Sequence, residues 1–515
     1  MNFELARDAL TSVQLAPASP LQWQNLCRLV QVLEADQQTL LIDEMERLPL
    51  VGWESMWLRC SALAFLTRDP VWFARQAALA TAQTPPDAVM AMLGLAWHHA
   101  MARTLNQHEF VQLLQNVNAP GLQRLVAQRM PIATRPHRVA GPKLRVAVYT
   151  PQVVSSKHGG STLALNVMSV LVRAGADFKT FTAQEATISE ANSQRGGAEF
   201  LAQQAVQIES LVLNAPGLAQ LMLPDGQFSL RVRFEQMLSA IRAYEPDLLV
   251  FVGFMSPLVY RLYENYPVLG LSLHSLPPIV PADVWLSAQP DANAALWPDL
   301  PTPQVAHYPF RFWPKGTPQA ADLSSMGLPA SALVLLTAGA RLAVELTSPW
   351  QDRMLAFIEA NANVHWLVIG VPAGTTLVFA DHPRVHVMAP QMALETWLAA
   401  ADIYLNPPRM GGGGTVAMAM EQGLPVVSFT GGDGGDKVGE FAVSSLDQYF
   451  DCLLAWVTDS AARAQVGSAL KQDFHRRLDM SAEPAQIALL QACHSAIAAF
   501  KERKEAQSAC TPINP

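Results

Sequence analysis

The chain has 515 residues, of which 50% are apolar and 15% are charged, and its formal net charge is −8. This composition excludes a disordered chain, and the acidic balance argues against nucleic acid as the main partner. Five scattered cysteines, an N-terminus that does not resemble a signal peptide and the lack of any long apolar run predict a cytoplasmic protein without a zinc site or a membrane span.

Residues 1–138 are predicted to form an all-helical domain, because apolar residues recur at spacings of three and four. Proline and glycine mark the turns between these helices. No fixed-period repeat is evident, so a bundle and a repeat array are both open. The proline-rich, basic stretch that ends at Lys143 is interpreted as a linker.

At Leu144 the pattern changes to apolar strands that alternate with helices. In the first series, residues 144–320, strands are expected at 144–151, 177–182, 248–254 and 268–274, with helices at 161–173 and 232–244. In the second series, residues 321–490, strands are expected at 332–339, 365–371, 384–390, 403–405 and 425–429, with helices at 349–361 and 415–422. This alternation predicts an α/β protein with two doubly wound, Rossmann-like sheets that face a cleft, followed by a C-terminal helix and tail over residues 491–515.

A run of glycines separates the strand at 403–405 from the helix that follows it. The run comprises Gly411, Gly412, Gly413 and Gly414, and Thr415 comes directly after it. Backbone N–H groups at the start of a helix favour an anion, and ligands of such folds bind beyond the carboxyl ends of the strands. The loop is therefore predicted to bind a diphosphate. The alternative is a tight turn without a ligand.

The second half of the chain resembles family 41 of the GT-B glycosyltransferases, which includes the O-GlcNAc transferases and the bacterial N-glucosyltransferases that modify adhesins. The resemblance is carried by RVHVMAP, ADIYLNPP, the Gly/Thr loop and GLPVVSF, with a fainter match at EPDLLVFVGF, and it extends over about residues 144–490. It implies a GT-B enzyme with a helical N-terminal domain. The expected activity is metal-independent, inverting transfer of a hexose or N-acetylhexosamine from a UDP-sugar to a protein side chain, with no other cofactor.

The resemblance also implies roles for residues at the phosphate end of the donor. The family places an acid where this chain has Met418, so Glu421, one turn further on, is the expected substitute at the donor ribose. Arg341 would replace a lysine of the family and neutralise the β-phosphate of the leaving nucleotide. The alternative for Arg341 is a surface arginine that pairs with Glu345.

Three further residues, Met388, Ala389 and Gln391, match the turn that holds uracil in the family. The alternative is an ordinary strand-to-helix turn. Asp433 and Lys437 lie in a second glycine-rich segment, TGGDGGDK, where they would contact the sugar hydroxyls or belong to a solvated loop.

In the first series, His158 follows the first strand and is expected to act as a general base on the acceptor or to orient the donor. His274 and Asp283 lie beyond another strand end and are weaker candidates. Alternatives to protein glycosylation are a glycan or lipid-linked acceptor and a catalytically degenerate binding protein. The sugar, the nucleotide base and the oligomeric state are left open.

Overall fold

The computed structural model describes residues 2–103, 106–131, 143–153, 158–185, 221–222, 228–372, 375, 377–391 and 393–509. The predicted linker falls on residues 132–142, outside the described residues. The chain divides into two compact units: unit 1 comprises Met1–His99, Val111–His307 and Ile487–Pro515, and unit 2 comprises Ala100–Phe110 and Tyr308–Gln486. These units are coarser than the four predicted segments, whose boundaries stay predictions.

The N-terminal segment is helical, and several of its helices begin at proline, glycine or asparagine. Pro20 starts one helix, and Asn118, at φ 51°, caps another by accepting a hydrogen bond from the Gly121 N–H at 3.2 Å. The helices are α1 (Asn2–Leu15), α2 (Pro20–Gln31), α3 (Ala35–Arg47), α4 (Trp53–Thr67), α5 (Val71–Ala78), α6 (Pro86–Arg103), α7 (Gln107–Asn116) and α8 (Ala119–Ala127).

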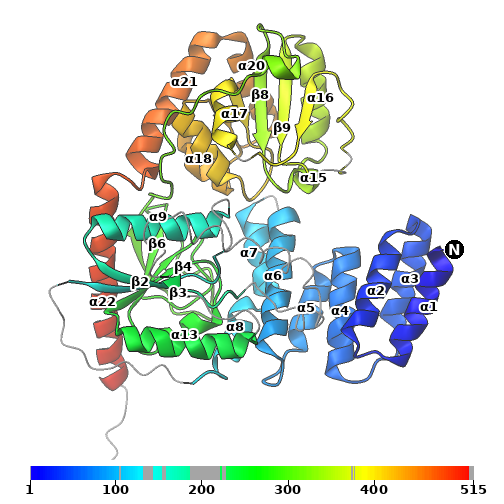
Figure 1. Ribbon diagram of the computed structural model, residues 1–515, viewed down its shortest axis with the longest axis vertical. Helices are drawn as coiled ribbons and strands as arrows, with labels where there is room; N and C mark the ends of the chain where they lie inside the picture. Colours follow the sequence, from blue (N-terminus) through cyan, green and yellow to red (C-terminus); the bar gives the residue numbers. More distant parts are fainter. Residues whose placement is uncertain are drawn as a thin grey trace, which may run out of the picture. The chain divides into compact units, whose positions relative to one another are not determined.

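A parallel sheet of seven strands forms the centre of unit 1, in the order β3-β2-β1-β4-β5-β6-β7. The strands are β1 (Arg145–Tyr149), β2 (Asp177–Phe181), β3 (Leu221–Met222), β4 (Leu248–Val252), β5 (Val268–Leu271), β6 (Val284–Ser287) and β7 (Gln304–His307). Helices α9 (Gly159–Arg173) and α13 (Leu230–Tyr244) lie on opposite sides of this sheet, and α14 (Pro257–Tyr263) joins β4 to β5 (Figure 1). The strand order reverses between β1 and β4, which is where such folds form a crevice.

A second parallel sheet, in the order β10-β9-β8-β11-β12, forms the centre of unit 2. Its strands are β8 (Leu333–Ala338), β9 (Val364–Ile369), β10 (Val385–Met388), β11 (Ile403–Leu405) and β12 (Val426–Val427). One face packs on α16 (Trp350–Ala360) and α20 (Leu446–Thr458), and the other on α17 (Leu394–Ala400), α18 (Gly413–Gln422) and α21 (Ser460–Asp473) (Figure 1). Because both faces are covered, the strands are almost entirely apolar.

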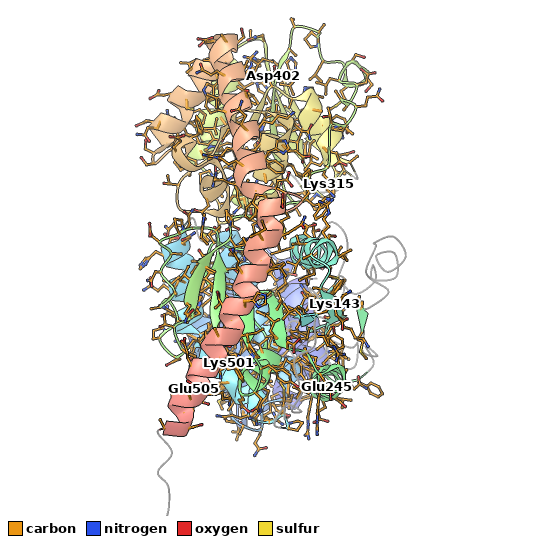
Figure 2. All side chains as sticks on the ribbon, turned by 90° about the vertical axis from the view of Figure 1, so that its left-hand side faces the viewer. Lys143, Glu245, Lys315, Asp402, Lys501 and Glu505 are labelled. Carbon is orange, nitrogen blue, oxygen red and sulfur yellow. The ribbon has the colours of Figure 1, made fainter. Side chains whose placement is uncertain are left out.

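The remaining elements are short, apart from the C-terminal helix. They are η3 (Ser324–Met326), α15 (Leu342–Glu345), α19 (Asp433–Val438), η4 (Gly439–Phe441), η5 (Phe474–Leu478) and α22 (Glu483–Ala509). The end of α22, which carries Lys501 and Glu505 in Figure 2, is attached to unit 1 through Arg503, whose Nε donates to Asp283 Oδ1 at 2.8 Å. Among the described helices, none combines the length and the apolar character that crossing a bilayer requires.

Candidate functional site

Three chain segments meet at the carboxyl edge of the second sheet because its strands are parallel. They follow β8 at Gly339–Arg341, β11 at Asn406–Gly412 and β12 at Ser428–Gly432. Ligands of doubly wound folds bind at this edge. Together with α18 and α19, the helices that follow two of them, the segments contain most of the residues that the sequence pointed to, which makes this edge the candidate site.

The glycine loop leads directly into α18. The helix begins at Gly413, two residues earlier than predicted, and Gly412 precedes it at φ 92° and ψ −8°, in the left-handed region that favours glycine. Because Gly412 has no side chain, the N-cap residue itself cannot cap this end of the helix. The first N–H groups of a helix have no partner within it, so this end can receive an anion.

Packing explains three of the four glycines. A Cβ at Gly411 would lie 2.7 Å from Nη2 of Arg341, and one at Gly412 would lie 2.6 Å from Nε of Arg409. A Cβ at Gly413 would lie 2.9 Å from the carbonyl oxygen of Asp433. Only at Gly414 is there open space, since the nearest atom belongs to Phe312 at 4.0 Å. The loop is therefore close-packed, and the two readings of it, tight turn and anion site, are compatible.

Arg409, which the sequence analysis did not single out, lies directly beneath the loop and is only 6% exposed. Its Nε donates to Asn406 Oδ1 at 2.8 Å, and its Nη1 donates to Glu345 Oε2 at 2.9 Å. Its Nη2 donates to the Ala338 carbonyl at 3.1 Å and to the Tyr404 hydroxyl at 3.2 Å. These bonds fix a cation in the interior beneath the start of α18.

Arg341 is also paired, but only along one side of its guanidinium. Its Nε donates to Glu345 Oε1 at 3.0 Å, while its side chain stays 35% exposed. Nη2 lies against Gly411, and in the described part of the chain neither Nη atom donates to another residue. Arg341 therefore pairs with Glu345, as the alternative predicted, and also faces the glycine loop, while its contact with a phosphate stays a prediction.

Thr415 lies in the first turn of α18. Its side chain lies near the phenol of Tyr404 and lowers the pKa of that phenol, against burial, which raises it. Tyr404 also receives the hydrogen bond from Arg409. Thr415 is thus connected to the buried Arg409, and its predicted phosphate contact stays a prediction.

In the turn after β10, which was predicted to hold uracil, several polar groups are already bonded within the protein. The Met388 carbonyl accepts from the N–H groups of Gly370 and Val371, at 2.9 and 3.1 Å. The Gln391 side chain folds back and donates to the Ala389 carbonyl at 3.0 Å. Ala389 is exposed at the end of an edge strand. The predicted uracil contact would fall on this exposed backbone. The Gln391 side chain would first have to give up its hydrogen bond to the Ala389 carbonyl.

Glu421 has a different partner from the one predicted. Its Oε1 accepts from the N–H groups of Lys315 and Gly316, at 2.6 and 2.8 Å, and the residue is 5% exposed. Burial raises the pKa of Glu421 against these two bonds, which lower it. We assign Glu421 to anchoring the segment before β8, an arrangement that does not favour the predicted ribose contact.

Within the segment TGGDGGDK, Asp433–Lys437 belong to the short buried helix α19, so the reading of these residues as a solvated loop is wrong. Asp433 is 7% exposed and Lys437 is 3% exposed. Burial lowers the pKa of Lys437, while Asp433 and Asp436 oppose that shift. The Asp433 N–H donates to the Met410 carbonyl at 2.9 Å, which ties α19 to the glycine loop. Direct contact of these side chains with a sugar stays a prediction.

In unit 1, His158 is the N-cap of α9. Its Nδ1 accepts from the Ser161 N–H at 3.2 Å, so Nε2 carries the ring proton and faces the Gln152 side chain at 3.3 Å. Exchanging the oxygen and nitrogen of the Gln152 amide would let its Oε1 accept from His158 Nε2. As placed, Oε1 has no partner among the described residues. Burial lowers the pKa of His158, so the ring is neutral at pH 7. The ring has no spare lone pair, which favours the orienting role over the general-base role.

The sequence analysis missed a buried carboxyl group at the carboxyl edge of the first sheet. Glu185 follows β2, is 3% exposed, and accepts hydrogen bonds from the hydroxyls of Tyr149 and Ser256. Its Oε2 has no partner among the described residues. Burial raises the pKa of Glu185 to about 8, against the two hydrogen bonds and Arg233. Its position after a predicted strand was the available signal, the same one used for His158.

The other two candidates of unit 1 are structural. Asp283 accepts from the Val268 N–H at 2.8 Å as well as from Arg503, so both of its oxygens are engaged. His274 is 4% exposed, and its ring lies 5.0 Å from that of Phe254 and 5.9 Å from that of Trp97. Neither residue is presented to a ligand.

A cavity of about 300 Å³ lies elsewhere in unit 1. It is lined by Arg124, Gln128, Tyr260, Arg261, Tyr263 and Leu300, among others. None of the predicted site residues lines it, and its walls come from the end of α8, from α14 and from the residues before β6 and β7. Those walls belong to the amino edge of the sheet, away from the edge at which ligands of this fold react.

The architecture agrees with a known fold. Over 97% of this chain and 94% of the other, the structure is similar to a lysine-to-methionine mutant of the O-GlcNAc transferase of Thermobaculum terrenum, with a TM-score of 0.54 and 13% sequence identity. The match over nearly the full length of both chains shows a shared fold and confirms the predicted GT-B class.

Two other solved structures match less of the chain. The pneumococcal O-GlcNAc transferase GtfA, in complex with UDP and GlcNAc, matches 70% of this chain and 99% of its own, at 10% identity and a TM-score of 0.44. A putative UDP-N-acetylglucosamine 2-epimerase from Listeria monocytogenes matches 64% and 91%, at 12% identity and 0.40. No protein-family model and no curated protein sequence matches the chain.

Proposed function

We propose that the protein is a glycosyltransferase that moves a hexose or N-acetylhexosamine from a UDP-sugar to a protein side chain. The observation that carries the proposal is the position of Arg341, whose Nη2 lies against Gly411 at the start of α18. A guanidinium and the free N–H groups of a helix start then face the same place, at the carboxyl edge of a sheet in a GT-B fold. Two such donors together suit a diphosphate.

The reaction would be a displacement at the anomeric carbon of the donor. The acceptor atom forms a bond to that carbon, the bond from it to the β-phosphate oxygen breaks, and the electron pair leaves with UDP. Negative charge therefore develops on the β-phosphate, where Arg341 and the N–H groups of α18 would stabilise it. These groups would do the work that a metal ion does in other transferases. A single displacement gives inversion.

Other residues would hold the reactants. The exposed backbone after β10, around Ala389, would take the base, and α19 with Lys437 would support the glycine loop from behind. In unit 1, the neutral ring of His158 carries its proton on Nε2 and would donate a hydrogen bond to a reactant once Gln152 moves aside. The acceptor proton would pass to a base, and no residue is assigned to that role because His158 is given an orienting role.

A non-catalytic sugar-nucleotide binding protein is the second candidate. Two observations favour it: Met418 stands where the resemblance implies an acid, and Glu421, the nearest substitute, is bonded to the backbone of Lys315 and Gly316. Such a protein would keep the diphosphate site and lose turnover. A glycan or lipid-linked acceptor stays a third possibility for an active enzyme, with no observation that selects it.

A thermal-shift screen tests the donor class. The full chain is incubated with UDP, GDP and CMP and with their common sugar conjugates. A ligand at a hundred times its Kd stabilises the folded state by about 2.7 kcal/mol, which raises the melting temperature. We expect UDP and a UDP-hexose to produce the shift. No response to any nucleotide would overturn the proposal.

Turnover separates the two main candidates. We expect slow hydrolysis of the UDP-sugar that binds, measured as UDP release without an acceptor, and faster release once a protein acceptor is added. Binding without any release, even with a broad set of acceptors, would select the binding protein.

A further inference from the structure

One buried carboxylate connects the two arginines of the candidate site. Glu345 is the last residue of α15, and its side chain is 2% exposed. Its Oε2 accepts from Arg409 Nη1 at 2.9 Å, and its Oε1 accepts from Arg341 Nε at 3.0 Å. The two cations therefore share this one carboxylate.

Arg409 is the fixed member of this trio. Besides Glu345 it is bonded to the Asn406 side chain, the Ala338 carbonyl and the Tyr404 hydroxyl. Its guanidinium also lies between two glycines, since a Cβ at Gly339 would be 2.6 Å from Nη1 and one at Gly412 would be 2.6 Å from Nε. Because these contacts fix the guanidinium of Arg409, they also fix the position of the Glu345 carboxylate that accepts from it.

Arg341 is the movable member. It is the more exposed of the two, at 35% of its side chain against 3% for Arg409, and a long exposed side chain loses rotamer freedom when it binds an anion. Because Glu345 holds Nε, the guanidinium is turned so that Nη2 faces Gly411. That leaves the Nη pair for two parallel hydrogen bonds to a phosphate.

We propose that Glu345 is a positioning residue, which transmits the fixed position of Arg409 to Arg341 and so pre-orients Arg341 for a diphosphate. This inference rests on the proposed function only in its choice of natural ligand. Charge alone predicts the opposite effect, since a carboxylate next to the site repels an anion and its removal would strengthen binding. The sign of the change therefore distinguishes orientation from charge.

The test is a double-mutant cycle with inorganic pyrophosphate as the probe, read by isothermal titration calorimetry on the full chain. Glu345→Gln is expected to weaken pyrophosphate binding about tenfold, or about 1.4 kcal/mol. In an Arg341→Ala background the same substitution is expected to have no further effect, because its action passes through Arg341. Equal or tighter binding by Glu345→Gln, or a loss of the same size in both backgrounds, would overturn the proposal.

Two variants guard against misfolding. Glu345→Asp keeps the charge that buried Arg409 needs but is too short to span both guanidiniums, so it is expected to show the same loss. Glu235→Gln is the matched control, because Arg231 Nε and Glu235 Oε1 form an (i, i+4) pair of the same 3.0 Å length on α13 in unit 1. It should bind pyrophosphate like the wild type.

UDP provides the second arm. A wild type that binds pyrophosphate but neither UDP nor a UDP-sugar would overturn the proposed function and leave the role of Glu345 intact. A wild type that binds UDP, with an effect of Glu345→Gln that does not depend on Arg341, would overturn the positioning role alone.

Discussion

The carboxyl edge of each sheet contains a glutamate and an arginine, but these side chains differ in their partners and in their exposure to solvent. At the second sheet, Glu345 pairs with Arg409 and Arg341, and Arg341 keeps 35% of its side chain in solvent. At the first sheet, Glu185 is buried and bonded to two hydroxyls, and burial raises its pKa to about 8. The nearby Arg233 is fully buried and donates to the carbonyls of residues 183 and 184.

The difference predicts a different kind of recognition at each edge. A partly exposed cation attracts a charged ligand, whereas a buried acid that stays protonated and an arginine bonded to backbone carbonyls do not. If the proposed function holds, the charged half of the donor should bind at the second sheet, and neutral hydrogen bonding is expected at the first.

The largest effect is expected at the charged edge. Replacing Arg341 with Ala should weaken UDP binding and lower turnover by roughly 100-fold or more, because it removes a donor to the charge that develops on the leaving phosphate. The measurement is steady-state UDP release, with binding followed by calorimetry. Unchanged kinetics would remove the role assigned to Arg341 and, with it, the contrast between the two edges.

The next effect is a pH dependence at the neutral edge. Because the pKa of Glu185 rises from 4.5 to about 8 on folding, the folded state holds more protons than the unfolded state between these values. Stability is then lost as pH rises through this window, by on the order of a few kcal/mol. Urea unfolding at pH 5 and pH 8.5 should show that Glu185→Gln gains stability relative to the wild type at the higher pH. The same difference at both pH values would mean that Glu185 is ionised throughout.

A pair of glycine substitutions probes the packing of the loop. Gly412→Ala should cost about 2–4 kcal/mol of unfolding free energy, because its φ of 92° disfavours a side chain and a Cβ would collide with Arg409. Gly414→Ala is the matched control, since nothing lies closer than 4.0 Å. Its stability should be unchanged or slightly higher, because alanine favours a helix. Equal losses in both would contradict the packing account.

The smallest effect is expected at Glu421. In Glu421→Gln the side-chain oxygen can still accept from the N–H groups of Lys315 and Gly316, so stability should fall by no more than about 1 kcal/mol. UDP affinity should stay the same if Glu421 only anchors this segment. A tenfold or greater loss of UDP affinity would restore the predicted ribose contact.

The strands and helices of the second sheet were largely predictable because their patterns are strong. Its strands are apolar and β-branched, and Gly412 with the helix after it marks a clear start. Strands β6 and β7 were missed, since each is four residues long and lies among prolines and turn residues. The segment at Asp433 was misread because glycine-rich sequence predicts a loop, whereas burial against Met410 and Gly413 makes it helical.

Residues of the candidate site could be predicted only where they directly follow a predicted strand. Arg341 and the glycine loop were found in this way, and Glu185 had the same signal without being chosen. Arg409 follows two prolines and has no local pattern, so its role appears only when Glu345, 64 residues earlier, is brought to it by the fold. Long-range ion pairs of this kind leave no periodic trace in a sequence.

The guanidinium of Arg409 lies between Gly339 and Gly412, two positions that are distant along the chain. A methyl group at either one would need a shorter residue at 409, and a shorter residue would leave Glu345 without its internal partner. Substitutions at positions 339, 409 and 412 are therefore expected to occur together in related sequences.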